Sequence, residues 1–224
     1  MAKATATTST AASEHKRAPR GEYAKSKQTR RAILDAAVEV FAQSGYRAGS
    51  LREVAQRVGM SEAGLLHHFR SKRALLLALL DHRDELSRAL VDFDVPDGVE
   101  SLRSLAELAR FNAAQPGIVE LYCTLSAEAT SPDHPAHDYF VRRYDYVRTS
   151  ITNSFERAAS AGRLADGVDP ARAAVVAVAL MDGLQVQWLL DPGSTDMADA
   201  LHEVFRSLIR GYDVVPLERV GDDA

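Results

Sequence analysis

The sequence predicts an all-α fold, and three observations support this. Apolar residues recur at helical spacing through most of the 224-residue chain, Gly and Pro fall between these stretches, and sustained alternation of strand composition is absent. The run 175–178 is rich in Val, but its Ala, Leu and Met neighbours favour a buried helix. Hydrophobic residues make up 46% and charged residues 26% of the chain, the balance of a soluble globular protein whose core needs no disulfide or metal.

The first helix is expected after an irregular basic arm. Residues 1–24 contain few large apolar side chains together with Pro19 and Gly21, which indicates a disordered segment. A helical pattern then begins at Lys27 and stops at Gly45.

Three serines mark the starts of the next helices. Ser50 and Glu53 have the spacing of a capping box, in which the serine accepts from the backbone N–H of Glu53 and the carboxylate reaches back. Gly59 suits the left-handed position after this helix. Ser61 and Ser71 are expected to cap two more helices. The pattern predicts helices at 51–58, 62–69 and 72–90.

The remainder also has a helical pattern, broken by Pro and Gly turns. We expect five helices there, at 99–115, 118–129, 135–161, 170–190 and 196–211.

Charge is unevenly distributed along the chain. Residues 1–73 carry a net charge of +8 and residues 74–224 a net charge of −12, which suggests a polyanion-binding head on an acidic body, or else a well-solvated basic tail. The single cysteine, Cys123, fits a reducing, cytoplasmic setting. No uninterrupted apolar run reaches about 18 residues, so a membrane span is not expected. The first 20 residues lack the apolar core of a secretory signal.

A helix-turn-helix is predicted from two short helices joined by the turn Gly59-Met60-Ser61. In such a motif the second helix enters the major groove of DNA and the first braces it. The segment 49–76 closely resembles the DNA-binding domain of the TetR family of bacterial transcriptional regulators. The matching features are the capped helix, this turn, Leu65, His68-Phe69, and Lys72 followed by Leu75.

The resemblance is specific over residues 27–80 and extends to the helical remainder only in length and pattern. It implies a homodimeric repressor of a palindromic operator, released when a small effector enters the C-terminal body. The domains expected are the arm at 1–24, a DNA-binding domain at 25–73, an effector-binding and dimerisation domain at 74–212, and a tail at 213–224. The last two long helices would pair the two copies.

The resemblance and the local chemistry together assign the DNA-contacting residues. The groove-facing candidates are Ser61, Glu62, Ala63, Gly64 and His67. The phosphate candidates are Ser50, Arg52, Lys72 and Arg47. A basic arm of Lys25, Lys27, Arg30 and Arg31 would reach the minor groove or the backbone. For each charge, a solvated surface position is the alternative.

Two positions near the end of the recognition helix need separate comment. The family usually places a phosphate-contacting tyrosine where this chain has Leu66, so that contact is either lost, replaced by His67, or exchanged for apolar contact with a thymine methyl. His68 is assigned a structural or phosphate-contacting role by the resemblance. Adjacent histidines on a helix do not converge on one metal ion.

Candidate effector contacts are the polar and aromatic residues of the body. They are Phe111, Asn112, Tyr122, Tyr139, Tyr144, Gln185 and Trp188. His134 and His137 have metal-ligand spacing, although neighbouring prolines favour a capping role. Cys123 is expected to be a buried, inert thiol and not a redox sensor.

No cofactor or metal is expected, and the sequence shows no catalytic constellation, so an enzyme is disfavoured. Two alternatives stay open at this point: a DNA-binding regulator that has no small effector, and a helical enzyme whose N-terminal part only resembles a DNA-binding head. An aromatic-lined cavity would favour an effector, and a solid core would not.

Overall fold

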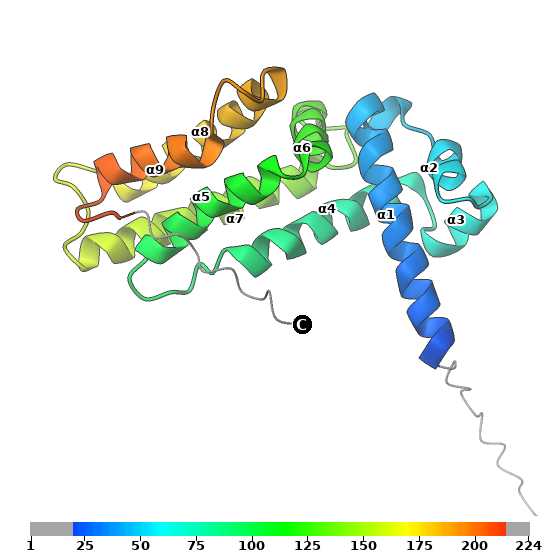
Figure 1. Cartoon of the computed structure of the whole chain (residues 1–224), viewed down its shortest axis with the longest axis horizontal. Coiled ribbons are helices and arrows are strands. Elements are labelled where there is room, and N and C mark those ends of the chain that lie inside the picture. Colours follow the sequence, from blue (N-terminus) through cyan, green and yellow to red (C-terminus); the bar gives the residue numbers. More distant parts are fainter. Residues whose placement is uncertain (1–19, 214–224) are drawn as a thin grey trace, which may run out of the picture.

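The computed structural model describes residues 20–213, and its regular elements are helices (Figure 1). Within this range the β pairing is limited to one isolated bridge, between Leu164 and Ile209. The all-α prediction is therefore confirmed. The helices are α1 (Arg20–Ala48), α2 (Leu51–Arg57), α3 (Glu62–His68), α4 (Lys72–Leu90), α5 (Val99–Ala113), α6 (Pro116–Glu128), α7 (His137–Ser160), α8 (Pro170–Leu190) and α9 (Met197–Leu208).

Most helix boundaries lie within two residues of the predicted ones, and α8 matches at both ends. The largest difference at a helix end in the body is in α9, which was expected to continue to residue 211. It ends at Leu208 because Ile209 adopts an extended conformation and pairs with Leu164. That bridge joins the end of α9 to the turn between α7 and α8.

The start of α1 corrects the predicted arm. The helix begins at Arg20, so residues 20–24 are helical, while residues 1–19 and 214–224 lie outside the described range. Ala, Lys, Gln and Arg dominate the segment after Gly21, and their high helix propensity extends the helix backwards. At its other end α1 bends sharply at Gly45, whose φ of 68° lies in the left-handed region.

The capping box predicted at α2 is not formed. The Ser50 hydroxyl accepts from the backbone N–H of Arg52 at 3.2 Å, one residue earlier than expected. The Glu53 carboxylate accepts instead from the Arg57 guanidinium at 3.0 Å, a charge-assisted bond that outcompetes a backbone N–H. The predicted N-caps of α3 and α4 are confirmed, because Ser61 and Ser71 accept from backbone N–H groups at 3.1 and 3.0 Å.

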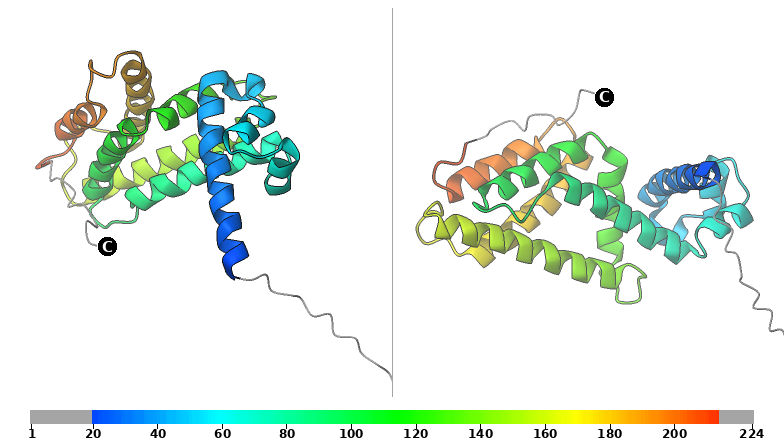
Figure 2. Two further views of the ribbon diagram at one scale, coloured as in Figure 1. Left: turned by 45° about the vertical axis from the view of Figure 1, so that its right-hand side comes forward. Right: turned by 90° about the horizontal axis from the view of Figure 1, so that it is seen from below.

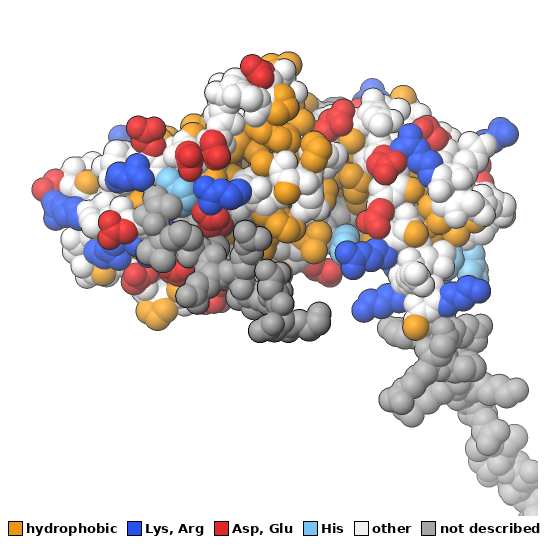
Figure 3. Space-filling view, viewed as in Figure 1, with side chains coloured by type: hydrophobic (Ala, Val, Ile, Leu, Met, Phe, Trp, Pro, Cys, Tyr) orange, Lys and Arg blue, Asp and Glu red, His pale blue; other side chains and the backbone are white. Residues whose placement is uncertain are grey.

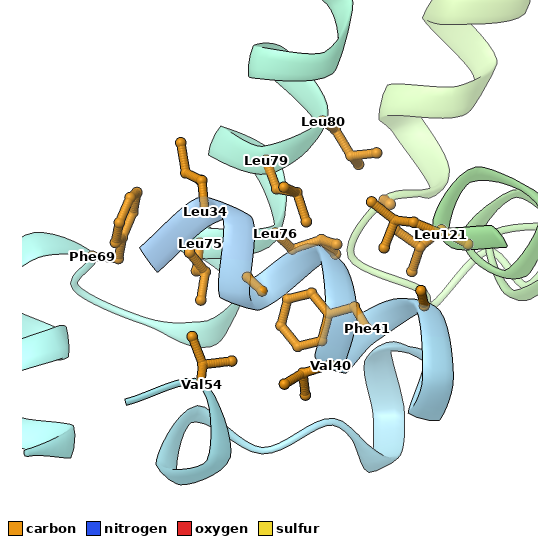
Figure 4. Packing of buried hydrophobic residues seen from close by; sticks show 14 of the residues in the cluster. Leu34, Val40, Phe41, Val54, Phe69, Leu75, Leu76, Leu79, Leu80 and Leu121 are labelled. Carbon is orange, nitrogen blue, oxygen red and sulfur yellow. The ribbon is translucent and has the colours of Figure 1, made fainter. Parts of the chain in front are cut away.

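One apolar core joins the helix-turn-helix head, α1–α3, to the rest of the molecule. Phe41 of α1, Val54 of α2 and Leu65 of α3 are buried in it together with leucines of α4. The same core includes Leu121 of α6, which Figure 4 shows beside α1 and α4. The head therefore does not fold around a core of its own, and its position depends on α6.

A second core holds the body together. It lies among α5, α7, α8 and α9, with the rings of Phe155 and Phe205 edge to face, 6.2 Å apart. The views in Figure 2 place the head at one end of the molecule, with α4 running from it into the body.

The two glycines that flank this body core allow a test of its packing. Gly98 and Gly162 both have φ near 69°. A Cβ at Gly98 would overlap the backbone carbonyl of Ser154 on α7, whereas nothing lies near a Cβ at Gly162. Gly162→Ala should cost only the left-handed strain, about 1–2 kcal/mol. Gly98→Ala should lower the free energy of unfolding by clearly more, as measured by urea denaturation. Equal losses would show that α5 and α7 are not in close contact there.

Candidate nucleic-acid interface and interior cavity

The recognition helix α3 presents one continuous exposed face. Its single fully buried residue is Leu65, which anchors the helix in the head core. Glu62, Ala63, Leu66 and His67 are exposed and lie on the opposite side, because residues three and four apart share a helix face. Ser61 is also exposed, while Gly64 is half-buried. The structure therefore brings the groove-facing candidates together on one surface.

Leu66 projects from this surface with 37% of its area exposed. The site carries no hydroxyl that could donate to a phosphate at this position. Between the small side chain of Ala63 and the imidazole of His67, Leu66 gives the recognition face an apolar centre. A thymine methyl is the base-edge group that such a surface fits.

Arg30 contacts the end of α3, which the sequence did not indicate. Its guanidinium donates to the backbone carbonyl of His68 at 2.9 Å and stacks over the Phe69 ring, 4.1 Å from the ring centroid. The contact satisfies a carbonyl in the last turn of the recognition helix and fixes that end against α1. Other arm candidates, Lys25, Lys27 and Arg31, are exposed on α1, where Figure 3 shows basic side chains along its lower part.

Lys72 also has an internal partner. Its ammonium donates to the Arg47 carbonyl at 3.1 Å and lies 4.6 Å from the centroid of the Tyr46 ring. Burial lowers the pKa of Lys72, and the nearby Glu128 carboxylate opposes that shift. Lys72 thus links the start of α4 to the end of α1. The remaining phosphate candidates, Arg47, Ser50 and Arg52, are exposed near this point.

Glu128 connects the head to the body and was missed in the sequence. Its carboxylate accepts from the backbone N–H of Tyr46 at 2.9 Å and packs against Gly45, at the bend of α1. An acid in the last turn of a helix is unfavourable with respect to the helix dipole. Its presence as the last residue of α6 was therefore a signal that another group uses the carboxylate.

His134 lies behind this contact and is buried. Its Nδ1 accepts from the backbone N–H of Ala136 at 3.2 Å, and its Nε2 lies 3.3 Å from the Glu128 carboxylate. The other histidine of the metal-like spacing, His137, contacts the Ala129 carbonyl at 2.8 Å. The two rings thus have separate partners, and no cluster of metal-ligating side chains occurs in residues 20–213.

The body has a partly open cavity between α4, α5, α6, α7 and α8, with a volume of about 40 Å³. Its aromatic wall consists of Phe93, Tyr122, Tyr144 and Tyr146. Its aliphatic wall consists of Val91, Leu105, Leu108, Val147, Val178 and Met181. Its polar groups are Arg83, Ser87, Arg88, Arg143, Asp182 and Gln185.

Three of the seven candidate effector contacts line this cavity: Tyr122, Tyr144 and Gln185. The structure does not bring the other four there. Asn112 is buried in an adjoining narrow void, and Trp188 lines a separate hollow between α5 and α9. Phe111 is 38% exposed. Tyr139 belongs to the core shared with the head, against Phe140.

The sequence interpretation missed the charged residues of the cavity. Arg83, Asp84 and Ser87 continue the spacing of the buried leucines on α4, so a charged pair on an apolar helix face was the available signal. Asp182 is the single acid within α8. A buried charge on an otherwise apolar face usually has a partner or a function.

These charges are close together. The Asp84 carboxylate lies 3.4 Å from both Arg83 Nη1 and Arg143 Nε. The Tyr144 hydroxyl donates to Asp182 at 2.7 Å. Burial raises the pKa of Asp182, and the Tyr144 hydrogen bond and the two arginines oppose that shift.

Cys123 lies on the same helix as Tyr122, with Sγ 3.8 Å from the Gln185 amide oxygen. Burial raises the pKa of its thiol to about 11. The thiolate is the reactive form, so this cysteine has little reactivity near neutral pH. The thiol is half-buried and not fully buried as expected, and its lack of reactivity stays a prediction.

Comparison with known proteins is consistent with this geometry. Residues 33–79 match the family described as bacterial regulatory proteins, tetR family, and residues 97–212 match the BetI-type transcriptional repressor, C-terminal family. The chain is similar to the HTH-type transcriptional regulator TtgR of Pseudomonas putida, with 27% identity over 85% of this chain and 92% of that protein. It is 31% identical to the HTH-type transcriptional repressor Rv1474c of Mycobacterium tuberculosis, over 66% and 88% of the two chains.

The fold has solved relatives as well. A putative transcriptional regulator from Saccharomonospora viridis, crystallised in complex with choline, superposes with a TM-score of 0.67 at 24% identity over 82% of this chain and 99% of that one. The chain belongs to the TetR family of bacterial transcriptional regulators. It is a helix-turn-helix DNA-binding protein.

The pKa of His134 predicts how the stability of the contact between the head and the end of α6 depends on pH. Burial lowers this pKa below 6.5, and the Glu128 carboxylate only partly offsets the shift. The unfolded chain therefore binds the proton first, and the free energy of unfolding should fall as pH drops below about 6.5. His134→Asn, which keeps an acceptor for Ala136, should reduce that fall in denaturation experiments between pH 7 and about pH 5.

The matched control is His67→Asn, because His67 is exposed on α3. This variant should keep the pH dependence of the unsubstituted protein. The same acid sensitivity in His134→Asn would show that another group causes it.

Proposed function

We propose that this regulator binds a palindromic DNA operator as a homodimer, represses transcription there, and is released by a small effector bound in the body. The DNA-binding part of this proposal is supported mainly by the exposed face of α3, which has Ala63 and Leu66 at its centre. Small side chains let the helix approach base edges closely, and the basic residues of α1 supply attraction for phosphate. Repression is supported by the matched repressor family and by the relative Rv1474c.

The dimer is supported by the surface of α8. Val175, Val176, Val186 and Leu190 are between 49% and 83% exposed on this helix and share one of its faces. A large exposed apolar patch is costly in a monomer and marks an interface. By length and composition alone α8 could also cross a membrane, but its inner face packs on the body core. A second copy of α8 and α9 is the cover we propose.

The effector part is supported by an aromatic-lined cavity in place of a solid core. Tyr122 of α6 lines that cavity, and Glu128, at the end of the same helix, holds the backbone of Tyr46 in α1. A helix transmits displacement along its axis as a rigid unit. An effector that moved α6 would therefore shift the bend of α1 and the spacing of the two heads.

Ala63→Asp tests the assigned DNA surface. A carboxylate at the centre of the recognition face should repel the phosphates and weaken binding at least about 100-fold. The duplex would first be selected from a random-sequence pool, and binding would then be measured by fluorescence anisotropy. Ala159→Asp, at an exposed position of α7 outside α8 and α9, is the matched control and should bind normally. Normal binding by Ala63→Asp would place the interface elsewhere.

The selected sequences and the salt dependence of binding distinguish specific recognition of an operator from a purely electrostatic contact with DNA. A palindrome with half-sites about 34–36 Å apart is expected. Contacts to about eight phosphates per dimer would give a slope of about −7 in log K against log salt. Retention without sequence preference, or a slope shallower than about −3, would contradict the proposal.

Val176→Glu tests the dimer surface. At a two-fold interface each substitution buries two carboxylates, so the dimer dissociation constant should rise at least about 100-fold. Val141→Glu is the matched control, because Val141 of α7 is also 56% exposed but lies outside α8 and α9. Sedimentation equilibrium should show a monomer for Val176→Glu and a dimer for Val141→Glu. A dimeric Val176→Glu protein would exclude this face.

A further inference from the structure

We propose that the body cavity binds a small carboxylic acid, with Arg83 and Arg143 as the partners of its carboxylate. The inference deepens the effector role proposed above and rests on it. It concerns the chemical class of the effector, which is determined by the charges on the cavity wall.

The two arginines are built into the cavity and are incompletely paired. Their side chains are only 10% and 11% exposed. Both Nε–H groups are buried, and no acceptor among the described residues completes a hydrogen bond to either of them. Asp84 lies 3.4 Å from each guanidinium, too far for a strong charge-assisted bond. A buried, unsatisfied guanidinium N–H is costly, and a carboxylate that accepts from it removes that cost.

The charge balance of the wall also favours an anion. Three arginines line the cavity, Arg83, Arg88 and Arg143, against the single acid Asp182. Asp84 lies beside the arginines and can neutralise only one of them. Burial raises the pKa of Asp182, which further limits the negative charge of the wall. Arg88 is exposed, so the excess of positive charge over Asp84 and Asp182 lies toward the solvent side of the cavity.

The groups of the cavity wall that could bind a cationic effector already have partners within the protein. The face of the Tyr122 ring, which could attract an ammonium group, is already covered by the Arg83 guanidinium at 4.2 Å from its centroid. The Asp182 carboxylate already accepts from the Tyr144 hydroxyl. An ammonium ion would thus add another buried cation next to the arginines, at a large electrostatic cost.

The rest of the wall fits the apolar part of such an acid. Leu105, Leu108 and Val178 form an aliphatic side, and Phe93 and Tyr146 form an aromatic one. Met181 also lines the cavity, and its flexible thioether can move to admit a ligand larger than the present volume. An aryl or short acyl acid combines these features.

Calorimetric titration of the full chain with three matched probes tests the inference. The probes are 3-phenylpropanoate, 3-phenylpropan-1-ol and 3-phenylpropylammonium, which share a body and differ in charge. The acid should bind at least about tenfold more tightly than the other two. Arg83→Gln and Arg143→Gln should each weaken its binding by about ten- to a hundredfold.

Two further variants separate binding from folding. Arg142→Gln alters the exposed neighbour of Arg143 on α7 and should leave the acid affinity unchanged. Arg143→Lys keeps the charge next to Asp84, so it should fold normally and still bind the acid more weakly, because it lacks the planar donor pair. Equal or tighter binding of the alcohol or the ammonium, an unchanged acid affinity in both arginine variants, or no binding of any probe would overturn the inference.

The same samples distinguish this inference from the proposed function. If the alcohol or the ammonium releases the selected duplex and the acid does not, the carboxylate assignment fails while the effector-responsive regulator stands. If the unliganded protein shows no sequence-specific DNA binding, the proposed function itself fails, and the calorimetry still reports on the cavity.

Discussion

The packing of α1 against α6 is the constraint on which the rest of the structure depends. The head is small, and its core is completed by Leu121 and Leu125 of α6. The Glu128 carboxylate then satisfies the backbone N–H of Tyr46 at the bend of α1. Because α1 packs on α2 and α4 as well, the direction of α3 follows from this one contact. The DNA-reading surface is therefore positioned by the domain that holds the cavity.

Local chemistry made the helices predictable. Ser61, Ser71 and the Pro and Gly breaks determine helix starts and stops through short-range hydrogen bonds and backbone preferences, and these appear in the sequence. The capping box at Ser50 failed because Glu53 had a competing partner, Arg57, one turn later on the same helix. The sequence pattern correctly predicted the N-cap at Ser50. It did not show that the Arg57 guanidinium would compete with the backbone for the Glu53 carboxylate.

The candidate sites were less predictable because they depend on contacts between distant segments. Arg30 looked like a free arm cation, yet it is bonded to the His68 carbonyl, 38 residues later. Tyr122, Tyr144 and Gln185 meet in one cavity because α6, α7 and α8 converge there, while Phe111 turns outward at the end of α5. Helical periodicity gives the buried side of each helix and not the helix that it faces.

The small size of the cavity bears on how binding could change DNA affinity. A volume of about 40 Å³ has room for about three water molecules, so an organic effector requires the walls to separate. A ligand shifts a conformational equilibrium only by its difference in affinity for the two states. A narrow cavity makes that difference large, because the effector fits only the widened state. Since Tyr122 in the wall and Glu128 at the head lie on one helix, the widening that admits the effector is also the movement that would displace α1.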